Sequence, residues 1–254
     1  MRVQIHRWAR VGFGLGADPY ERSRPGYPPE AVTWLGERTR LAFGAEVVDV
    51  GAGTGKLTRL LTAIGAHIVA VEPVAEMRRH LQGIAGVDVL AGSAEAIPLP
   101  DASADIVTVA EAFHWFRGDA ALAEIHRVLR PGGSLALLWN RLDVTDSFAA
   151  SFHELVERNR GHAPVRDTGR WRQTVDQTTL FSTPEVRIFD NTHRLERGGL
   201  ADLAASETSI AILPDPRRTK VLAEVDALER TRAAPVVLRY ATEVALYERL
   251  RAEK

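Results

Sequence analysis

The sequence predicts an α/β protein built on a mostly parallel sheet with helices on both faces. Three observations predict this class: short apolar runs rich in valine and isoleucine, intervening segments with leucines at helical spacing, and glycine or proline at the junctions. Strands that alternate with helices in this way form βαβ units, whose strands run parallel. Strands that are apolar throughout are typical of a sheet covered on both faces.

Five strands and the helices between them are predicted in the first half of the chain. The strands fall at 46–50, 67–71, 87–91, 105–110 and 134–139. The helices fall at 56–64, 75–82 and 119–129, with a turn at 131–133.

The pattern is weaker after residue 141. It predicts helices over 147–158, 200–212 and 217–230, and strands over 185–195 and 235–247. The first 40 residues contain clusters of glycine and proline, which predict a loop-rich arm ahead of the sheet. We therefore expect one structural domain in three parts: an arm with a first helix at 1–40, a core at 41–140 and a C-terminal extension at 141–254.

The composition excludes several classes of protein. The 254 residues carry 32 Lys+Arg and 33 Asp+Glu, a net charge of −1, so we expect no nucleic-acid partner. The absence of cysteine excludes disulfides, cysteine-bound zinc, iron–sulfur clusters and a cysteine nucleophile. His153 and His162 lie in no carboxylate pattern that suggests a metal site. No apolar run approaches the ~18 residues of a membrane span, so we expect a cytoplasmic protein without a membrane partner.

The strongest local signal is the glycine loop at 51–55, which follows the first strand. Its three glycines lack a Cβ, so the chain can turn sharply and a ligand can approach the backbone. The helix that follows offers free N–H groups and a partial positive charge. Open α/β sheets also bind their ligands at this end of the strands.

Three nucleotide-binding loops compete for this segment. A phosphate-binding P-loop needs glycine at position 50 and serine or threonine at 57, where this chain has Val50 and Leu57. A dinucleotide loop that starts at Gly51 needs glycine at position 56, where this chain has Lys56. A GxGxG loop with an acid two residues before it, here Asp49, fits completely. A tight turn without a ligand is the remaining alternative, and Lys56 itself is expected on a solvated helix.

Polar side chains follow the next three strands. Glu72 ends the second strand, where a carboxylate can accept two hydrogen bonds from the vicinal hydroxyls of a ribose. The polar turn at 93–95 follows the third strand and could bind the edge of an adenine. Glu111 and His114 lie within an aromatic cluster after the fourth strand, a plausible reaction chamber. The alternatives are a solvated glutamate, a common loop and a helix start that packs aromatic rings into the core.

The order of these motifs resembles the class I S-adenosylmethionine-dependent methyltransferases. It is most similar to the subgroup of small-molecule enzymes that includes trans-aconitate methyltransferase. The matching segments are DVGAGTGKLT at 49–58, VEP at 71–73, GSAEAIPLPDASADIVTVAEAFHWF at 92–116, HRVLRPGGSLALLWN at 126–140 and, in the arm, PYERSRPGYP at 19–28. The resemblance implies a Rossmann-like fold with a seven-stranded sheet whose last strand is antiparallel.

The resemblance also implies which residues bind S-adenosylmethionine. Asp49 and the glycine loop would line the methionine part, and Glu72 would bind the ribose. Residues 93–95 and Met77 would contact the adenine, and Ala110 and Glu111 would lie beside the sulfonium. The arm, with Tyr27 among its residues, would close over the cofactor. The predicted cofactor residues are Tyr20, Arg24, Asp49, Gly51, Ala52, Gly53, Gly55, Glu72, Pro73, Met77, Ser93, Ala94, Glu95 and Ala110.

The chemistry of methyl transfer makes few demands on the protein. The leaving thioether needs no acid, so alignment of the reacting atoms and exclusion of water can supply most of the catalysis. A base is needed only if the acceptor must lose a proton. His114 is the first candidate because the unperturbed pKa of histidine, ~6.5, lies near working pH. Glu111 is the second predicted catalytic residue, either reacting or accepting a hydrogen bond.

We therefore predict a methyltransferase that acts on a small molecule, such as a carboxylic acid, which would need no base. The alternatives are a catalytically silent S-adenosylmethionine-binding protein, a nicotinamide-dependent oxidoreductase and a protein or RNA methyltransferase. A local basic run could steer an acidic acceptor, although a solvated surface is the favoured interpretation. The run comprises Arg158, Arg160, His162, Arg166, Arg170 and Arg172.

Overall fold

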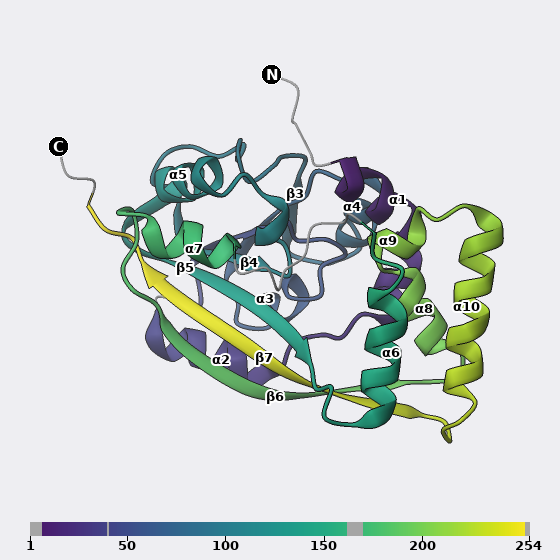
Figure 1. Cartoon of the computed structure of the whole chain (residues 1–254). Helices are drawn as coiled ribbons and strands as arrows, with labels where there is room; N and C mark the ends of the chain where they lie inside the picture. The colour runs from purple at the N-terminus through teal and green to yellow at the C-terminus, as the bar shows by residue number, and fades with distance from the viewer. Residues whose placement is uncertain (1–6, 40, 162–169, 252–254) are drawn as a thin grey trace.

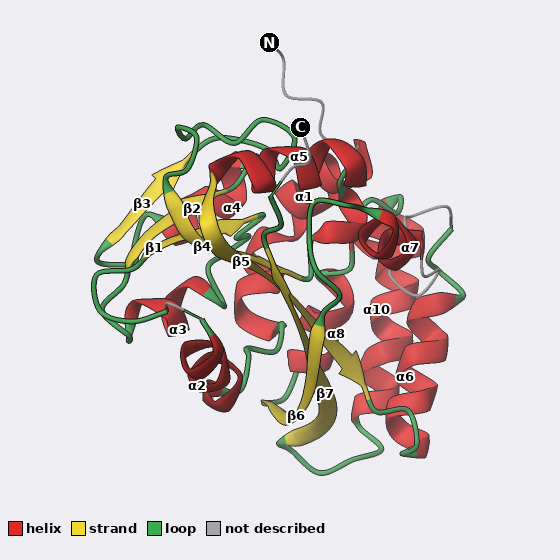
Figure 2. Cartoon of the chain, turned by 90° about the vertical axis from the view of Figure 1, so that its left-hand side faces the viewer, coloured by secondary structure: helices red, strands yellow, loops and turns green. Residues whose placement is uncertain are grey.

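A seven-stranded sheet with strand order β3-β2-β1-β4-β5-β7-β6 runs through the molecule (Figures 1 and 2). The computed structural model describes residues 7–39, 41–161 and 170–251. The strands are β1 (Glu46–Val50), β2 (His67–Val71), β3 (Val87–Leu90), β4 (Ala104–Ala110), β5 (Leu129–Leu142), β6 (Glu185–Leu195) and β7 (Val236–Glu248).

The pairing of the strands confirms the predicted topology. Strands β1 to β5 pair in parallel, whereas β7 is antiparallel to both β5 and β6. The strand order reverses between β1 and β4, and such a reversal leaves a crevice outside the carboxyl ends of the two strands. The fold therefore places the glycine loop, which follows β1, at this crevice.

Strand β5 begins five residues earlier than the predicted 134. Its pairing with β4 shifts from Ala104–Leu129 to Ile106–Ser134, so the predicted turn at 131–133 is a bulge within the strand. Gly132 adopts a φ of +78° there, which suits a residue without a Cβ.

Helices cover both faces of the sheet. Strand residues alternate between the faces, so that Val48 and Val50 pack under α5 and α7 while Val47 packs against α2 and α3. Figure 2 shows the sheet between these layers. The helices are α1 (Arg7–Ser23), α2 (Pro29–Arg38), α3 (Thr58–Thr62), α4 (Ala75–Leu81), the 3₁₀ turn η1 (Phe113–Trp115), α5 (Gly118–Val128), α6 (Ser147–Glu157), α7 (Arg170–Gln177), α8 (Gly199–Ala205), α9 (Thr208–Ala211) and α10 (Asp215–Glu229).

A separate helical cluster stands at one end of the sheet. Helices α6, α8, α9 and α10 share an apolar core with the end of β6 and the start of β7. Figure 1 shows this cluster at one end of β6 and β7, with α1 beside α9. The cluster forms a wall beyond the carboxyl ends of β1 and β4.

The prediction of a loop-rich arm is wrong for its described residues, because α1 and α2 occupy most of them. The glycines of α1 serve helix packing. A Cβ on Gly12 would lie 2.6 Å from Cβ of Thr208, so only glycine allows α1 to pack this closely against α9. Two further differences are the unpredicted helix α7 and the break near Ser206, which divides the predicted helix 200–212 into α8 and α9.

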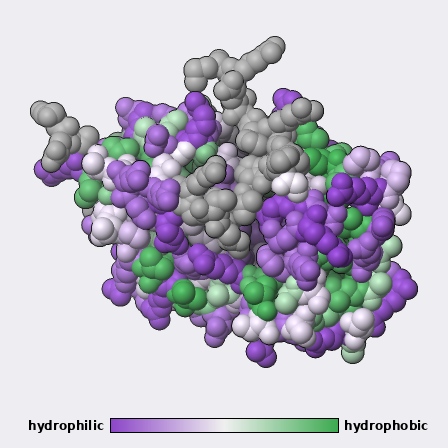
Figure 3. Space-filling model, in the orientation of Figure 1, coloured by the Kyte–Doolittle hydropathy of each residue, from purple (hydrophilic) through white to green (hydrophobic). Residues whose placement is uncertain are grey.

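The surface mixes polar and apolar side chains. In Figure 3 hydrophilic residues dominate the visible face, and the hydrophobic ones form small separate patches among them. Within residues 7–39, 41–161 and 170–251, no helix combines the length and the apolar character needed to cross a membrane.

Candidate active site

The glycine loop is held open by backbone hydrogen bonds and positive φ angles. The N–H of Gly51 donates to Val71 O at 2.8 Å, which ties the end of β1 to the end of β2. Gly51 and Gly53 adopt φ angles of +70° and +59°. A Cβ on Gly53 would meet no atom within 4 Å, so it would stand in open space where a ligand can lie.

Glu72 fastens this loop from the end of β2. Its carboxylate accepts hydrogen bonds from Gly53 N at 2.9 Å and Val74 N at 2.8 Å. Glu72 is only 5% exposed, and burial raises the pKa of its carboxyl group to about 7, against the lowering effect of the two backbone donors. The side chain is thus a fixed acceptor that faces the crevice.

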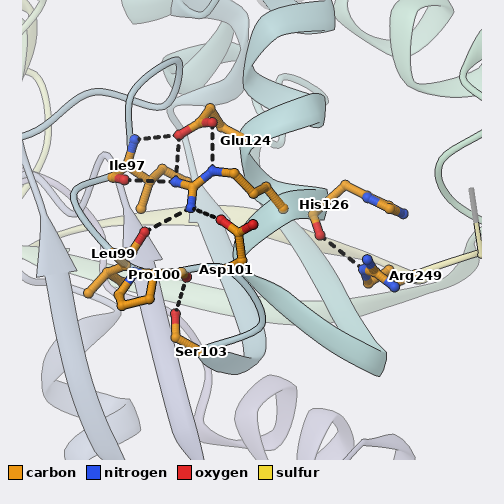
Figure 4. Close-up of polar contacts among 9 residues, drawn as sticks. Ile97, Leu99, Pro100, Asp101, Ser103, Glu124, His126 and Arg249 are labelled. Carbon is orange, nitrogen blue, oxygen red and sulfur yellow. Dashed lines mark hydrogen bonds and ion pairs between the residues drawn. The ribbon is translucent and has the colours of Figure 1, made fainter.

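The turn after β3 is braced by the side chain of Arg127 on α5. Its guanidinium donates to the carbonyl oxygens of Leu99 at 2.9 Å and Ile97 at 3.0 Å. Glu124 binds the same guanidinium and also accepts from Ile97 N at 3.0 Å; these contacts are drawn in Figure 4. Glu95, at the start of this turn, accepts from Arg117 N at the beginning of α5. Contacts with α5 and its first residues therefore hold the segment from Glu95 to Leu99, which lies outside the strands.

These elements surround a cavity that we call the glycine-loop cleft. Backbone and small side chains form most of its floor, and aromatic rings form one wall. It is lined by Phe13, Tyr20, Gly51, Gly53, Glu72, Pro73, Val74, Met77, Ser93, Ala94, Glu95, Ala110, Glu111, Ala112, Trp115 and Phe116.

A second cavity, the helical cleft, lies beside the first. It is enclosed by α1, the segment between α1 and α2, η1, α6, α8 and α9. Its lining residues are Phe13, Tyr20, Arg24, Pro25, Tyr27, Lys56, Glu111, His114, Trp115, Asn140, Leu142, Phe152, His153, Val156, Glu157, Arg160, Leu203, Glu207, Thr208 and Tyr240.

Four residues line both clefts: Phe13, Tyr20, Glu111 and Trp115. Glu111 stands at the end of β4 with a φ of +54°, a left-handed conformation that is uncommon for a residue with a side chain. Such backbone strain is typical of functional positions. The carboxylate of Glu111 accepts a hydrogen bond from Asn140 N, which aims it at the junction of the clefts.

Ten of the fourteen predicted cofactor residues line the glycine-loop cleft, but four do not. Arg24, like Tyr27 of the predicted arm, lines the helical cleft instead. Asp49 is buried below the loop, where its carboxylate accepts from Thr58 at 2.6 Å and Thr108 at 2.9 Å. Burial raises its pKa to about 6. Ala52 and Gly55 also lie outside the lining of both clefts. Among the predicted catalytic residues, Glu111 lines both clefts and His114 lines only the helical one.

Arg24 and Lys56 join α1 to this site. Nε of Arg24 donates to Ser206 Oγ at 2.7 Å, and its guanidinium pairs with Glu207 at 2.9 Å. Nζ of Lys56 donates to Glu21 O at 2.6 Å, and burial lowers the pKa of this amine. Lys56 is therefore not the solvated helix residue that the sequence predicts.

The predicted basic run does not form one surface. Arg160 pairs with Glu157 in the helical cleft, whereas Arg158 pairs with Glu224 at 2.9 Å and Arg172 with Glu243. His162, Arg166 and the side chain of Arg170 lie outside the described residues.

Sequence reasoning missed several lining residues of the helical cleft, among them Asn140, Phe152 and Tyr240. They lie on β5, α6 and β7, which are far apart in the sequence. Of these three, only Asn140 had a sequence signal, because it directly follows the predicted fifth strand, 134–139, as Glu111 follows the predicted fourth strand.

The arrangement suits a nucleoside next to a second small molecule. The buried carboxylate of Glu72 and the open side of Gly53 fit a ribose, and the turn at 93–95 fits a flat base. The fold is Rossmann-like, and its two adjoining clefts offer room for a nucleoside and a second small molecule, an arrangement typical of transferases.

Comparisons with known proteins agree with this class. A methyltransferase domain model matches residues 48–137. An uncharacterized methyltransferase of Mycobacterium tuberculosis is 40% identical over 225 residues, 88% of each chain. The solved structure of an Anaeromyxobacter dehalogenans protein described as a type II methyltransferase has 26% identity and a TM-score of 0.67, and it covers 89% of this chain and 97% of its own.

The chain belongs to the class I S-adenosylmethionine-dependent methyltransferases. An N-methyltransferase of Haemonchus contortus, solved with S-adenosylhomocysteine, shares the fold at a TM-score of 0.55 and 15% identity, over 98% of this chain and 61% of its own. Family and fold thus imply S-adenosylmethionine as the cofactor.

Proposed function

We propose that this enzyme transfers the methyl group of S-adenosylmethionine to a small molecule held in the helical cleft. The observation that carries the proposal is the junction of the two clefts at Tyr20, Glu111 and Trp115. A cofactor in one cleft and an acceptor in the other would meet there. Enclosure by helices on several sides favours a small acceptor over a protein or an RNA.

In this proposal the glycine-loop cleft holds the cofactor. Glu72 accepts hydrogen bonds from the ribose, the backbone at Gly51 and Gly53 lies against the methionine part, and Met77 with residues 93–95 encloses the adenine. When bound, S-adenosylmethionine supplies a methyl group on a positively charged sulfur that departs as a neutral thioether. The carboxylate of Glu111 lies at the junction, where a negative charge stabilises a sulfonium.

The helical cleft sets limits on the acceptor. Its lining carries Arg24, Lys56 and Arg160 against three carboxylates, so these formal charges cancel. The carboxylates are Glu111, Glu157 and Glu207. This balance favours a polar acceptor without a large net charge. A small carboxylic acid belongs to this range if Arg24 or Lys56 binds it.

His114 is the candidate base for an acceptor that must lose a proton. The centroid of its ring lies 5.0 Å from that of Trp115 and 5.4 Å from that of Trp139. We expect His114→Ala to lower turnover of a hydroxyl or amine acceptor and to alter its pH profile. Turnover by His114→Ala equal to that of the wild-type protein would exclude the base role and indicate that His114 only packs against its neighbours.

The function is tested with a labelled methyl donor. The protein is incubated with deuterated-methyl S-adenosylmethionine and a small-molecule cell extract, and mass spectrometry identifies labelled products. We expect one or a few compounds to gain the label with the wild-type protein and not with Glu72→Ala. Binding of S-adenosylhomocysteine without any labelled product would indicate a silent binding protein. Binding of NAD in its place would indicate an oxidoreductase.

A further inference from the structure

The segment between α1 and α2 carries three lining residues of the helical cleft, Arg24, Pro25 and Tyr27, yet it forms no helix or strand. An irregular segment of this kind depends on side chains elsewhere for a fixed position. Its Gly26 carbonyl is bound by side chains of two strands, β5 and β6, and a third strand, β7, supports one of these side chains.

Two asparagines hold the middle of the segment. Nδ2 of Asn140 on β5 donates to Gly26 O at 3.1 Å, and Nδ2 of Asn191 on β6 donates to the same oxygen at 2.9 Å. Asn191 also donates to Oδ1 of Asn140 at 3.1 Å, and Thr242 on β7 donates to that oxygen at 2.5 Å. We call Asn140, Asn191 and Thr242 the amide clamp.

A further contact holds the last residue of α1, immediately before the segment. Nε2 of His193, two residues beyond Asn191 on β6, lies 2.6 Å from Ser23 O. Side chains of the same edge strand, β6, therefore contact the carbonyl groups of both Ser23 and Gly26.

The amide clamp also reaches the junction of the clefts. The backbone N–H of Asn140 binds the carboxylate of Glu111, whose own N–H donates to Leu138 O at 2.9 Å. Asn140 thus contacts both Glu111, at the junction of the clefts, and the segment that carries Arg24 and Tyr27. The glycine-loop cleft has its own supports, Glu72 and Arg127, which do not involve the clamp.

We propose that Asn191, acting through Asn140, is a positioning residue of the acceptor site. Asn191 lines neither cleft. It aligns Glu111 with Arg24 and Tyr27, so that the acceptor is held in line with the methyl group. The proposal rests on the proposed function, because it assigns the helical cleft to the acceptor.

The test compares Asn191→Ala with Thr192→Ala, which changes the adjacent exposed residue of the same strand. The first measurement is hydrogen exchange of residues 23–28 in the protein saturated with S-adenosylhomocysteine. We expect at least tenfold faster exchange in Asn191→Ala and no change in Thr192→Ala, because two hydrogen bonds to the segment and its support are lost. Exchange equal to wild type would overturn the proposal.

The second measurement is methyl transfer to the acceptor pool of the same cell extract. We expect about a tenfold higher half-saturating amount of extract for Asn191→Ala, with affinity for S-adenosylhomocysteine within twofold of wild type. Asn191→Gln, which keeps the amide, should recover part of the loss. Equal weakening of cofactor affinity would show a general structural role and overturn the proposal. If the wild-type protein methylates nothing, the proposed function fails, while the exchange measurement still decides whether the clamp holds the segment.

Discussion

The two clefts are built in different ways. The glycine-loop cleft uses backbone and short side chains that directly follow β1, β2, β3 and β4, so neighbouring residues in the sequence supply each part. The helical cleft is assembled from α1, α6, α8, α9 and the ends of β5 and β7. Any chain whose strands end with these segments in this order can form the glycine-loop cleft. The helical cleft, by contrast, depends on how the C-terminal helices pack. The difference explains how a family can keep one cofactor and vary its acceptors.

The largest expected effect is the loss of cofactor affinity when Glu72 is replaced. We expect Glu72→Ala to weaken binding of S-adenosylhomocysteine by about 1.5–3 kcal/mol, because hydrogen bonds to a charged group are lost. Calorimetry measures this change, and thermal unfolding shows whether the fold persists. Glu46→Ala, at the opposite end of β1, serves as the control and should bind normally. Normal binding by a folded Glu72→Ala protein would remove the ribose role.

A second prediction tests whether Arg24 serves the acceptor or the cofactor, to which the family resemblance assigns it. Because Arg24 lines only the helical cleft, we expect Arg24→Met to raise the half-saturating acceptor concentration about tenfold and to leave cofactor affinity within twofold.

The matched control is Arg22→Met, two residues earlier at the end of α1, which removes an exposed ion pair with Asp202 of α8. Steady-state kinetics with the labelled acceptor and calorimetry with S-adenosylhomocysteine provide the two measurements. Loss of cofactor affinity without a change in the half-saturating acceptor concentration would show that Arg24 serves the cofactor.

The smallest expected effect is a pH dependence of cofactor binding. In the proposed ribose role of Glu72, the hydroxyls would donate to its ionised form, and burial raises the pKa of this carboxyl group to about 7. Affinity for S-adenosylhomocysteine should therefore rise about three- to tenfold between pH 6 and pH 8. Glu72→Gln should show a flat profile, and an equally steep one would assign the effect to another group.

The raised pKa of Glu72 makes the stability of the folded protein fall with rising pH, whereas cofactor affinity is expected to rise. The folded protein holds the Glu72 proton more tightly than the unfolded chain, where the pKa is 4.5. Its contribution to stability is thus present at low pH and is lost as the pH rises from about 4.5 to about 7. Asp49, with a pKa raised to about 6, acts in the same direction.

The sequence predicts the sheet better than the arm. Local side-chain patterns indicate each strand, and the predicted range 185–195 for β6 is confirmed. The antiparallel last strand, which the family resemblance implies, is confirmed as well. The glycines and prolines of the arm misled the prediction because their role is tertiary: Gly12 allows α1 to contact Thr208, almost two hundred residues away. Local sequence carries no trace of that partner.

The same limit applies to the candidate site. Glu72 and Gly53 are identified by their distance from strand ends, which the sequence contains. The partners of Lys56 and Arg24, namely Glu21 and Glu207, become neighbours only when α1 packs onto the core and the helical cluster. The burial of Lys56, like the placement of Arg24, is a consequence of that packing.

The position of α1 has one further consequence. Its residues Phe13 and Tyr20 belong to the walls of both clefts, and the helix packs closely against α9. The shapes of the two cavities are therefore coupled, because any displacement of this one helix would change both of them at once.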